Sequence, residues 1–145
     1  MKHLLLLTAL LLLTSQALPC SCIGPQKINN KQYKSYQIIA SGTVEKIEEK
    51  EDYKIIYFKV ETAYKGTSDE NLIEIRTAMD GGMCGISANA GDQWLMYAYQ
   101  TEYGAFTDLC TRSRNMERDY NQKMIRKDLK FLKRKRKRNP MFSGS

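Results

Sequence analysis

Four cysteines constrain this chain more than any other feature of its sequence. They are Cys20, Cys22, Cys84 and Cys110, and all four follow an apolar leader. An even cysteine count in a small exported protein indicates disulfides, because the compartment outside the cytosol is oxidising. A zinc site is the alternative, but a Cys-x-Cys pair followed by two distant single cysteines suits tetrahedral zinc poorly. We therefore expect two disulfides.

Geometry limits which cysteines pair. Four cysteines allow three pairings, and a bond between Cys20 and Cys22 would close a badly strained ring. The two remaining pairings both join segment 20–22 to two distant points of the chain, and the residues leave both open. Each such bond is worth about 3–5 kcal/mol on the chain-entropy account of disulfides.

The leader is typical of a secretory signal. Lys2 gives a positive start, residues 4–13 are almost unbroken apolar sequence, and residues 15–17 (Ser-Gln-Ala) offer small side chains to a signal peptidase. The apolar run is short for a membrane helix, which needs about 20 residues. We expect removal of residues 1–19, which leaves one secreted, extracellular domain (periplasmic in a bacterium) without a membrane span.

Apolar alternation with a period of two predicts a β-rich body. Ile38, Ala40, Gly42 and Val44 can share one side of a strand, and a leading segment at 23–35 is expected to be irregular. Five strands are expected, at residues 36–45, 53–64, 72–77, 93–100 and 105–110. Five strands with short turns favour an all-β fold with a C-terminal helix, a five-stranded OB-type Greek-key barrel stapled by disulfides.

The chain turns helical after the strands. Ser113 or Asn115 can cap this helix, and it should lie against the barrel and complete a domain at 20–132. Its apolar stripe consists of Met116, Tyr120, Met124, Leu129 and Leu132. Six cations then follow: Lys133, Arg134, Lys135, Arg136, Lys137 and Arg138. This run has no apolar partner, so residues 133–145 are expected to form a disordered basic tail.

The net charge of the chain comes from that tail. The formal net charge is +7, and residues 133–138 with Lys2 of the leader account for it, so the body is close to neutral. A solvated tail without a specific partner is one interpretation. The other is that the run binds a polyanion, such as an acidic polysaccharide, nucleic acid or a membrane surface.

No catalytic set is recognisable in the sequence. The one histidine, His3, lies in the leader, and the cysteines are expected to be oxidised, so neither imidazole nor thiolate chemistry is available. Gly81, Gly82 and Gly85 lack the lysine and the helix of a phosphate-binding loop. We therefore expect no enzyme activity and no cofactor.

Several short motifs follow the order of a known family. They are Cys-Ser-Cys at 20–22, Gly-Thr-Val at 42–44, Ala-Tyr-Lys-Gly at 63–66, Cys-Gly-Ile-Ser at 84–87 and Leu-Cys-Thr-Arg at 109–112. Together they resemble the N-terminal domain of the tissue inhibitors of metalloproteinases, within the netrin-like group, over about residues 20–115. The third disulfide and second domain of the animal inhibitors have no counterpart here.

The resemblance implies a pairing and a mechanism. Cys20 would pair with Cys84 and Cys22 with Cys110, which makes segment 20–22 a rigid ridge. In the family, the α-amino nitrogen and carbonyl oxygen of the first cysteine bind the catalytic zinc of a protease. Ser21 would point into the pocket for the residue after the cleaved bond, and Met83 would flank the ridge. The implied function is a secreted, monomeric inhibitor of zinc metalloendopeptidases.

Zinc binding depends on where the leader is cut. Cleavage after Ala17 would leave Leu18 and Pro19 ahead of Cys20, whose nitrogen would then be an amide and no zinc ligand. Cleavage after Pro19 would free the amine, and lipid attachment at Cys20 is a third possibility. The second hypothesis is therefore a non-inhibitory extracellular module of the same fold whose basic tail binds a polyanion.

Overall fold

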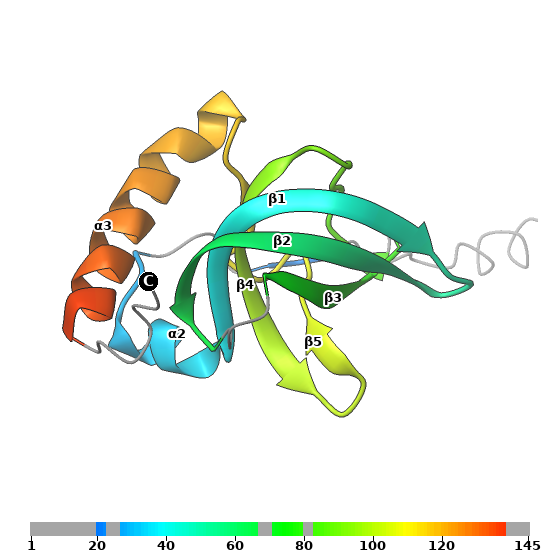
Figure 1. The fold of residues 1–145 in the computed structure, drawn as a ribbon, viewed down its shortest axis with the longest axis horizontal. Helices are drawn as coiled ribbons and strands as arrows, with labels where there is room; N and C mark the ends of the chain where they lie inside the picture. Colours follow the sequence, from blue (N-terminus) through cyan, green and yellow to red (C-terminus); the bar gives the residue numbers. More distant parts are fainter. Residues whose placement is uncertain (1–19, 23–26, 67–70, 80–82, 139–145) are drawn as a thin grey trace, which may run out of the picture.

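The computed structural model describes residues 20–22, 27–66, 71–79 and 83–138 (Figure 1). Its elements are α2 (Asn30–Ser35), β1 (Ile38–Glu49), β2 (Tyr53–Lys65), β3 (Leu72–Ala78), β4 (Gln93–Thr101), β5 (Gly104–Phe106), β6 (Arg114–Asn115), a 3-10 turn (Asp119–Asn121) and α3 (Gln122–Arg138). The expected leader at 1–19 and the end of the expected tail at 139–145 lie outside the described residues.

Five strands close into a barrel. The order is β1-β2-β3-β5-β4, and a further pairing of β1 with β4 completes the circle. Every pairing is antiparallel except that of β3 with β5. The expected OB-type barrel with a C-terminal helix and two disulfides is therefore confirmed. The short β6, which the sequence did not predict, pairs with β4.

β1 pairs with two neighbours because it is long and irregular. Its register with β2 shifts at three points, one of them between Ser41 and Gly42. A Cβ atom on Gly42 would lie 2.0 Å from the carbonyl oxygen of Lys59. Only glycine allows the two backbones to approach this closely.

The barrel interior holds the apolar side of the alternating strands. Ile38, Ala40 and Val44 of β1 are buried there together with Phe58 of β2, as the period of two predicts. Ile86, outside the strands, is buried in the same cluster. The core therefore extends from the strands to the loop that follows Cys84.

A second cluster lies between the barrel and α3, which covers one side of it (Figure 1). Ile39 and Tyr97 from the strands are fully buried here with Leu132 of α3. Beside them the Tyr97 hydroxyl donates to Oδ2 of Asp128 over 2.9 Å. The Arg112 guanidinium also binds Asp128, with Nη2 2.7 Å from Oδ1 and Nε 3.0 Å from Oδ2.

Helix α3 differs from expectation at both ends. It begins at Gln122, because the two expected caps serve the barrel instead: Ser113 Oγ accepts the Tyr97 amide over 2.9 Å, and Asn115 pairs with Trp94 of β4. At the other end the helix continues through residues 133–138, where a disordered tail was expected. Lysine and arginine are good helix formers, and cations favour a helix C-terminus.

Helix α2 lies in the segment that was expected to be irregular. Asn29 caps it, accepting the Gln32 amide at Oδ1 over 2.9 Å. At its other end Lys65 Nζ donates to the carbonyl oxygens of Tyr33 and Lys34 over 3.0 and 3.1 Å. Capping at both ends stabilises a helix too short to persist alone.

Candidate functional site

The two disulfides hold residues 20–22 against the barrel. Cys20 is bonded to Cys84 and Cys22 to Cys110, with Cα–Cα distances of 5.7 and 5.0 Å. This is the pairing that the resemblance implies. Ser21 lies between the two bonds and is exposed. We call residues 20–22 the Cys-Ser-Cys ridge.

The two loops that hold the ridge are bonded to each other. The Leu109 amide donates to the carbonyl oxygen of Cys84 over 2.9 Å. Asp108 Oδ1 in turn accepts the amides of Cys110 and Thr111 over 2.8 and 2.9 Å. The ridge therefore rests on one hydrogen-bonded support rather than on two independent loops.

The loop that carries Cys84 is fixed to the barrel. The Gly85 amide donates to the carbonyl oxygen of Met79 over 3.0 Å, and the Ile86 amide donates to Thr77 Oγ1 over 3.1 Å. A Cβ atom on Gly85 would lie 1.9 Å from the Ala78 carbonyl oxygen, so this position requires glycine. Cys84, the disulfide partner of the first ridge residue, thus lies two positions before Ile86, which is buried in the core.

Apolar side chains are exposed beside both disulfides. Met83, the neighbour of Cys84, is 53% exposed, and Leu109, the neighbour of Cys110, is 44% exposed. Leu109 also lines a hollow of about 490 Å³ together with Trp94 and Arg118. Met83 was predicted from the sequence as a flanking residue, whereas Leu109 was not, although Leu109 directly precedes a cysteine.

Both cysteine sulfurs of the ridge are engaged in disulfides. The sulfur of Cys20 is bonded to Cys84, so only the backbone nitrogen and oxygen of Cys20 are candidate zinc ligands. Within the described ranges, no three histidine, cysteine, aspartate or glutamate side chains are grouped so that they could hold a metal ion. In the same ranges no helix has the length and apolarity needed to cross a membrane.

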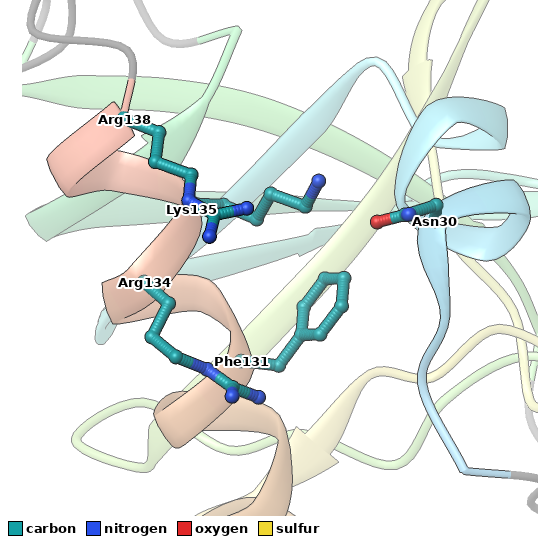
Figure 2. Close-up of a pocket in the computed structure, with 5 residues that line it drawn as sticks. All are labelled: Asn30, Phe131, Arg134, Lys135 and Arg138. Carbon is teal, nitrogen blue, oxygen red and sulfur yellow. The ribbon is translucent and has the colours of Figure 1, made fainter.

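The other candidate residues form the last six positions of α3. Arg134, Lys135 and Arg138 line a hollow of about 220 Å³ together with Asn30 of α2 and Phe131 (Figure 2). We call this hollow the α2–α3 groove. The six cations were predicted from the sequence as one group, and Asn30 and Phe131 were not predicted beside them. The aromatic residue four positions before Lys135 was the available signal, since such residues are neighbours on a helix.

No family model matches the chain, and a search of curated proteins gives no match. The likeness to the metalloproteinase inhibitors therefore rests on the motifs of the sequence. The function has to be inferred from the chain's own residues and their arrangement.

Proposed function

We propose that this protein is a secreted inhibitor of zinc metalloendopeptidases that binds the protease zinc through the backbone of Cys20. The observation that supports this proposal is the attachment of the ridge. A disulfide at each end ties it to a hydrogen-bonded support, and Ser21 is exposed between them. Two disulfides are also compatible with an oxidising, extracellular location.

An N-terminal Cys20 could bind zinc through its α-amino nitrogen and its carbonyl oxygen. A catalytic zinc keeps an open position for water or substrate, which a nitrogen and an oxygen donor can occupy. The amine must be neutral to bind, and an α-amino pKa of about 7.7–8.0 makes deprotonation easy near neutral pH. This mechanism requires cleavage of the leader after Pro19, so that Cys20 begins the mature chain.

The rigid attachment of the ridge favours tight binding without cleavage. A segment already held in place loses little conformational freedom when it binds. Ser21 enters the protease pocket for the residue after the cleaved bond, while Met83 contacts the wall of the cleft. The disulfides keep the ridge peptide bonds away from the geometry that hydrolysis needs.

The test is to determine the mature N-terminus and then measure inhibition. Mass spectrometry of the secreted protein should show Cys20 as the first residue. A panel of zinc endopeptidases should then be inhibited by the protein with a free amine and not by the same protein acetylated at Cys20. A mature chain that begins at Leu18, or equal inhibition by the two forms, contradicts the proposal.

A control for folding makes this comparison decisive. The acetylated protein should have the same far-ultraviolet circular dichroism and the same unfolding midpoint as the free form. Lost inhibition then reports the loss of the zinc ligand, because acetylation changes one atom's chemistry and leaves both disulfides intact.

A second candidate function is a non-inhibitory extracellular module that binds a polyanion. The observation that favours it is the charge of α3, in which ten of 17 residues are lysine or arginine. The one acidic residue of this helix, Asp128, is buried against Arg112. Affinity for a polyanion should fall steeply between about 50 and 200 mM salt. Binding that is unchanged by salt, or by removal of residues 133–138, contradicts this second function.

A further inference from the structure

We propose that the α2–α3 groove binds one sulfated sugar unit of a linear extracellular polysaccharide. This inference rests on the second candidate function and names both the class of polyanion and the place where it binds. It concerns Arg134, Lys135 and Arg138 rather than the whole basic run, together with Asn30 and Phe131.

The helix separates the six cations into two sets. Positions 134 and 138 lie one turn apart on α3, and position 135 lies beside them, so their side chains reach the same groove (Figure 2). Lys133, Arg136 and Lys137 do not line this groove. The two arginines can each form paired hydrogen bonds with a sulfate group, a geometry that a guanidinium provides and an ammonium does not.

Lys135 is held in position by aromatic rings. Its Nζ lies 5.6 Å from the ring centre of Phe131 and 5.7 Å from that of Tyr33. The two rings also contact each other edge to face, with centres 6.1 Å apart. A cation fixed in this way binds an anion with less loss of side-chain freedom than a freely moving lysine.

Phe131 and Asn30 suit a sugar ring beside the sulfate. Phe131 is half-buried on the groove wall and presents an apolar surface, while the Asn30 side chain points across the gap from α2 (Figure 2). An amide offers both a donor and an acceptor, which hydroxyl groups on a sugar can use together. The groove thus combines charge, an aromatic surface and an amide within about 220 Å³.

A second hollow continues the groove and suits a linear ligand. It has a volume of about 480 Å³, shares Asn30, Phe131 and Arg134 with the groove, and adds Lys27. Among the described residues that line the two hollows, none is acidic. A chain with a sulfate in the groove could therefore extend toward Lys27 without meeting a repelling charge.

The groove favours a sulfated polysaccharide over nucleic acid. Proteins that bind single strands usually stack successive bases on several aromatic side chains, and among the described residues only one aromatic side chain, that of Phe131, lines the groove. The oxidising location with which the disulfides are compatible is also where sulfated polysaccharides occur.

The test compares two triple variants of the full mature chain that remove equal charge. One is Arg134→Gln with Lys135→Gln and Arg138→Gln; the matched control is Lys133→Gln with Arg136→Gln and Lys137→Gln. Isothermal titration calorimetry with a heparin hexasaccharide should show that the groove variant loses affinity by roughly 30-fold or more and that the control loses less than about threefold. The slope of log affinity against log salt should fall by about 2–3 for the groove variant and by less than about 1 for the control.

Phe131→Leu tests the groove without changing its charge. It should weaken hexasaccharide binding about fivefold and leave the salt slope unchanged, because the sulfate contacts remain. Circular dichroism should show intact α3 in every variant, and Phe131→Leu keeps the test valid if a triple variant fails to fold.

The outcomes separate the groove from the function on which it rests. Equal losses in the two triple variants would mean that the six cations act as one diffuse charge, which overturns the groove and leaves polyanion binding standing. No binding by the wild-type protein overturns both. Tighter binding to single-stranded DNA or to phosphatidylserine vesicles at the same salt overturns the choice of a sulfated polysaccharide.

Discussion

Asp128 shows how one residue can join an element to the rest of the fold. It belongs to α3, yet its carboxylate accepts hydrogen bonds from Arg112 and from Tyr97 of β4. All three side chains are buried. The sequence could not identify this group, because a single aspartate in a basic helix is normally expected on the surface. Its partners are 16 and 31 positions away.

Replacement of Asp128 should be among the most damaging single changes. Asp128→Ala removes the carboxylate that two nitrogens of the buried Arg112 guanidinium contact, and we expect a loss of about 3–5 kcal/mol of unfolding free energy. Urea unfolding, monitored by tryptophan fluorescence, measures this loss. The double variant Asp128→Leu with Arg112→Met should recover most of the loss, since apolar replacement of a whole buried pair is often neutral. A loss below about 1 kcal/mol for Asp128→Ala would show that the pair is dispensable.

Two buried tyrosines predict sensitivity to high pH. Burial raises the pKa of Tyr97 well above its usual value, and the nearby Asp128 carboxylate adds to this. Burial also raises the pKa of Tyr36, with a further contribution from its hydrogen bond to Tyr99. Above about pH 10 the unfolded chain loses these protons while the folded chain keeps them. The contribution of the two hydroxyls to the unfolding free energy is therefore fully present below about pH 10 and declines above it.

The expected decline is about 1.4 kcal/mol per pH unit for each tyrosine. Urea midpoints measured between about pH 8 and pH 11 should therefore be constant at first and then fall. Absorbance of ionised tyrosine should show that part of the tyrosine titration occurs only with unfolding. Constant midpoints across this range would mean that neither hydroxyl is held neutral by the fold.

At the scale of elements, the sequence predicted what periodicity and turn residues encode. The first two barrel strands were predicted because their apolar residues alternate, and burial of Val44 and Phe58 confirms the period. The other three were predicted from short apolar segments between turn-rich stretches, and β4 is buried without alternation. Helix α2 was missed because Asn30–Ser35 has no apolar stripe and depends on Asn29 and Lys65 for its ends. The start of α3 was misplaced because Ser113 is as suitable for a barrel hydrogen bond as for a helix cap.

Docking of α3 on the barrel depends on Leu132. This side chain is fully buried in the second cluster, so Leu132→Ala should lower the unfolding free energy by about 2–5 kcal/mol. The neighbouring Lys133 is exposed, and Lys133→Ala serves as the control with a change within about 0.5 kcal/mol. Thermal unfolding of both variants decides the question. Equal midpoints would indicate that α3 does not pack on the barrel through this residue.

At the scale of the whole molecule, the ridge depends on parts that are far apart in the chain. The sequence named the four cysteines, but the pairing came from a resemblance, and the support formed by Asp108, Leu109 and the Cys84 carbonyl was not foreseen. Backbone hydrogen bonds between two loops leave no pattern in the residue types. They follow only when the barrel has brought both loops to one place.

The two disulfides should contribute similarly to the stability of the fold and differently to its function. Their sequence separations are 64 and 88, and loop entropy depends on the logarithm of length, so removal of either should lower the unfolding free energy by about 4–5 kcal/mol, with a difference of only about 0.3 kcal/mol. The variants are Cys20→Ser with Cys84→Ser, and Cys22→Ser with Cys110→Ser, compared by urea unfolding.

Inhibition should separate the same two variants. Loss of the Cys20 bond releases the residue that would supply both zinc ligands in the proposed mechanism, whereas loss of the Cys22 bond leaves that residue tied to Cys84 and its bonded neighbour Leu109. The proposed mechanism therefore requires a larger rise of the inhibition constant for the first variant, measured at a temperature where both are folded. Equal inhibition constants would mean that inhibition does not depend on a disulfide that fixes the position of Cys20. A larger effect of the Cys22 bond would place the critical contact beyond the ridge, beside Leu109.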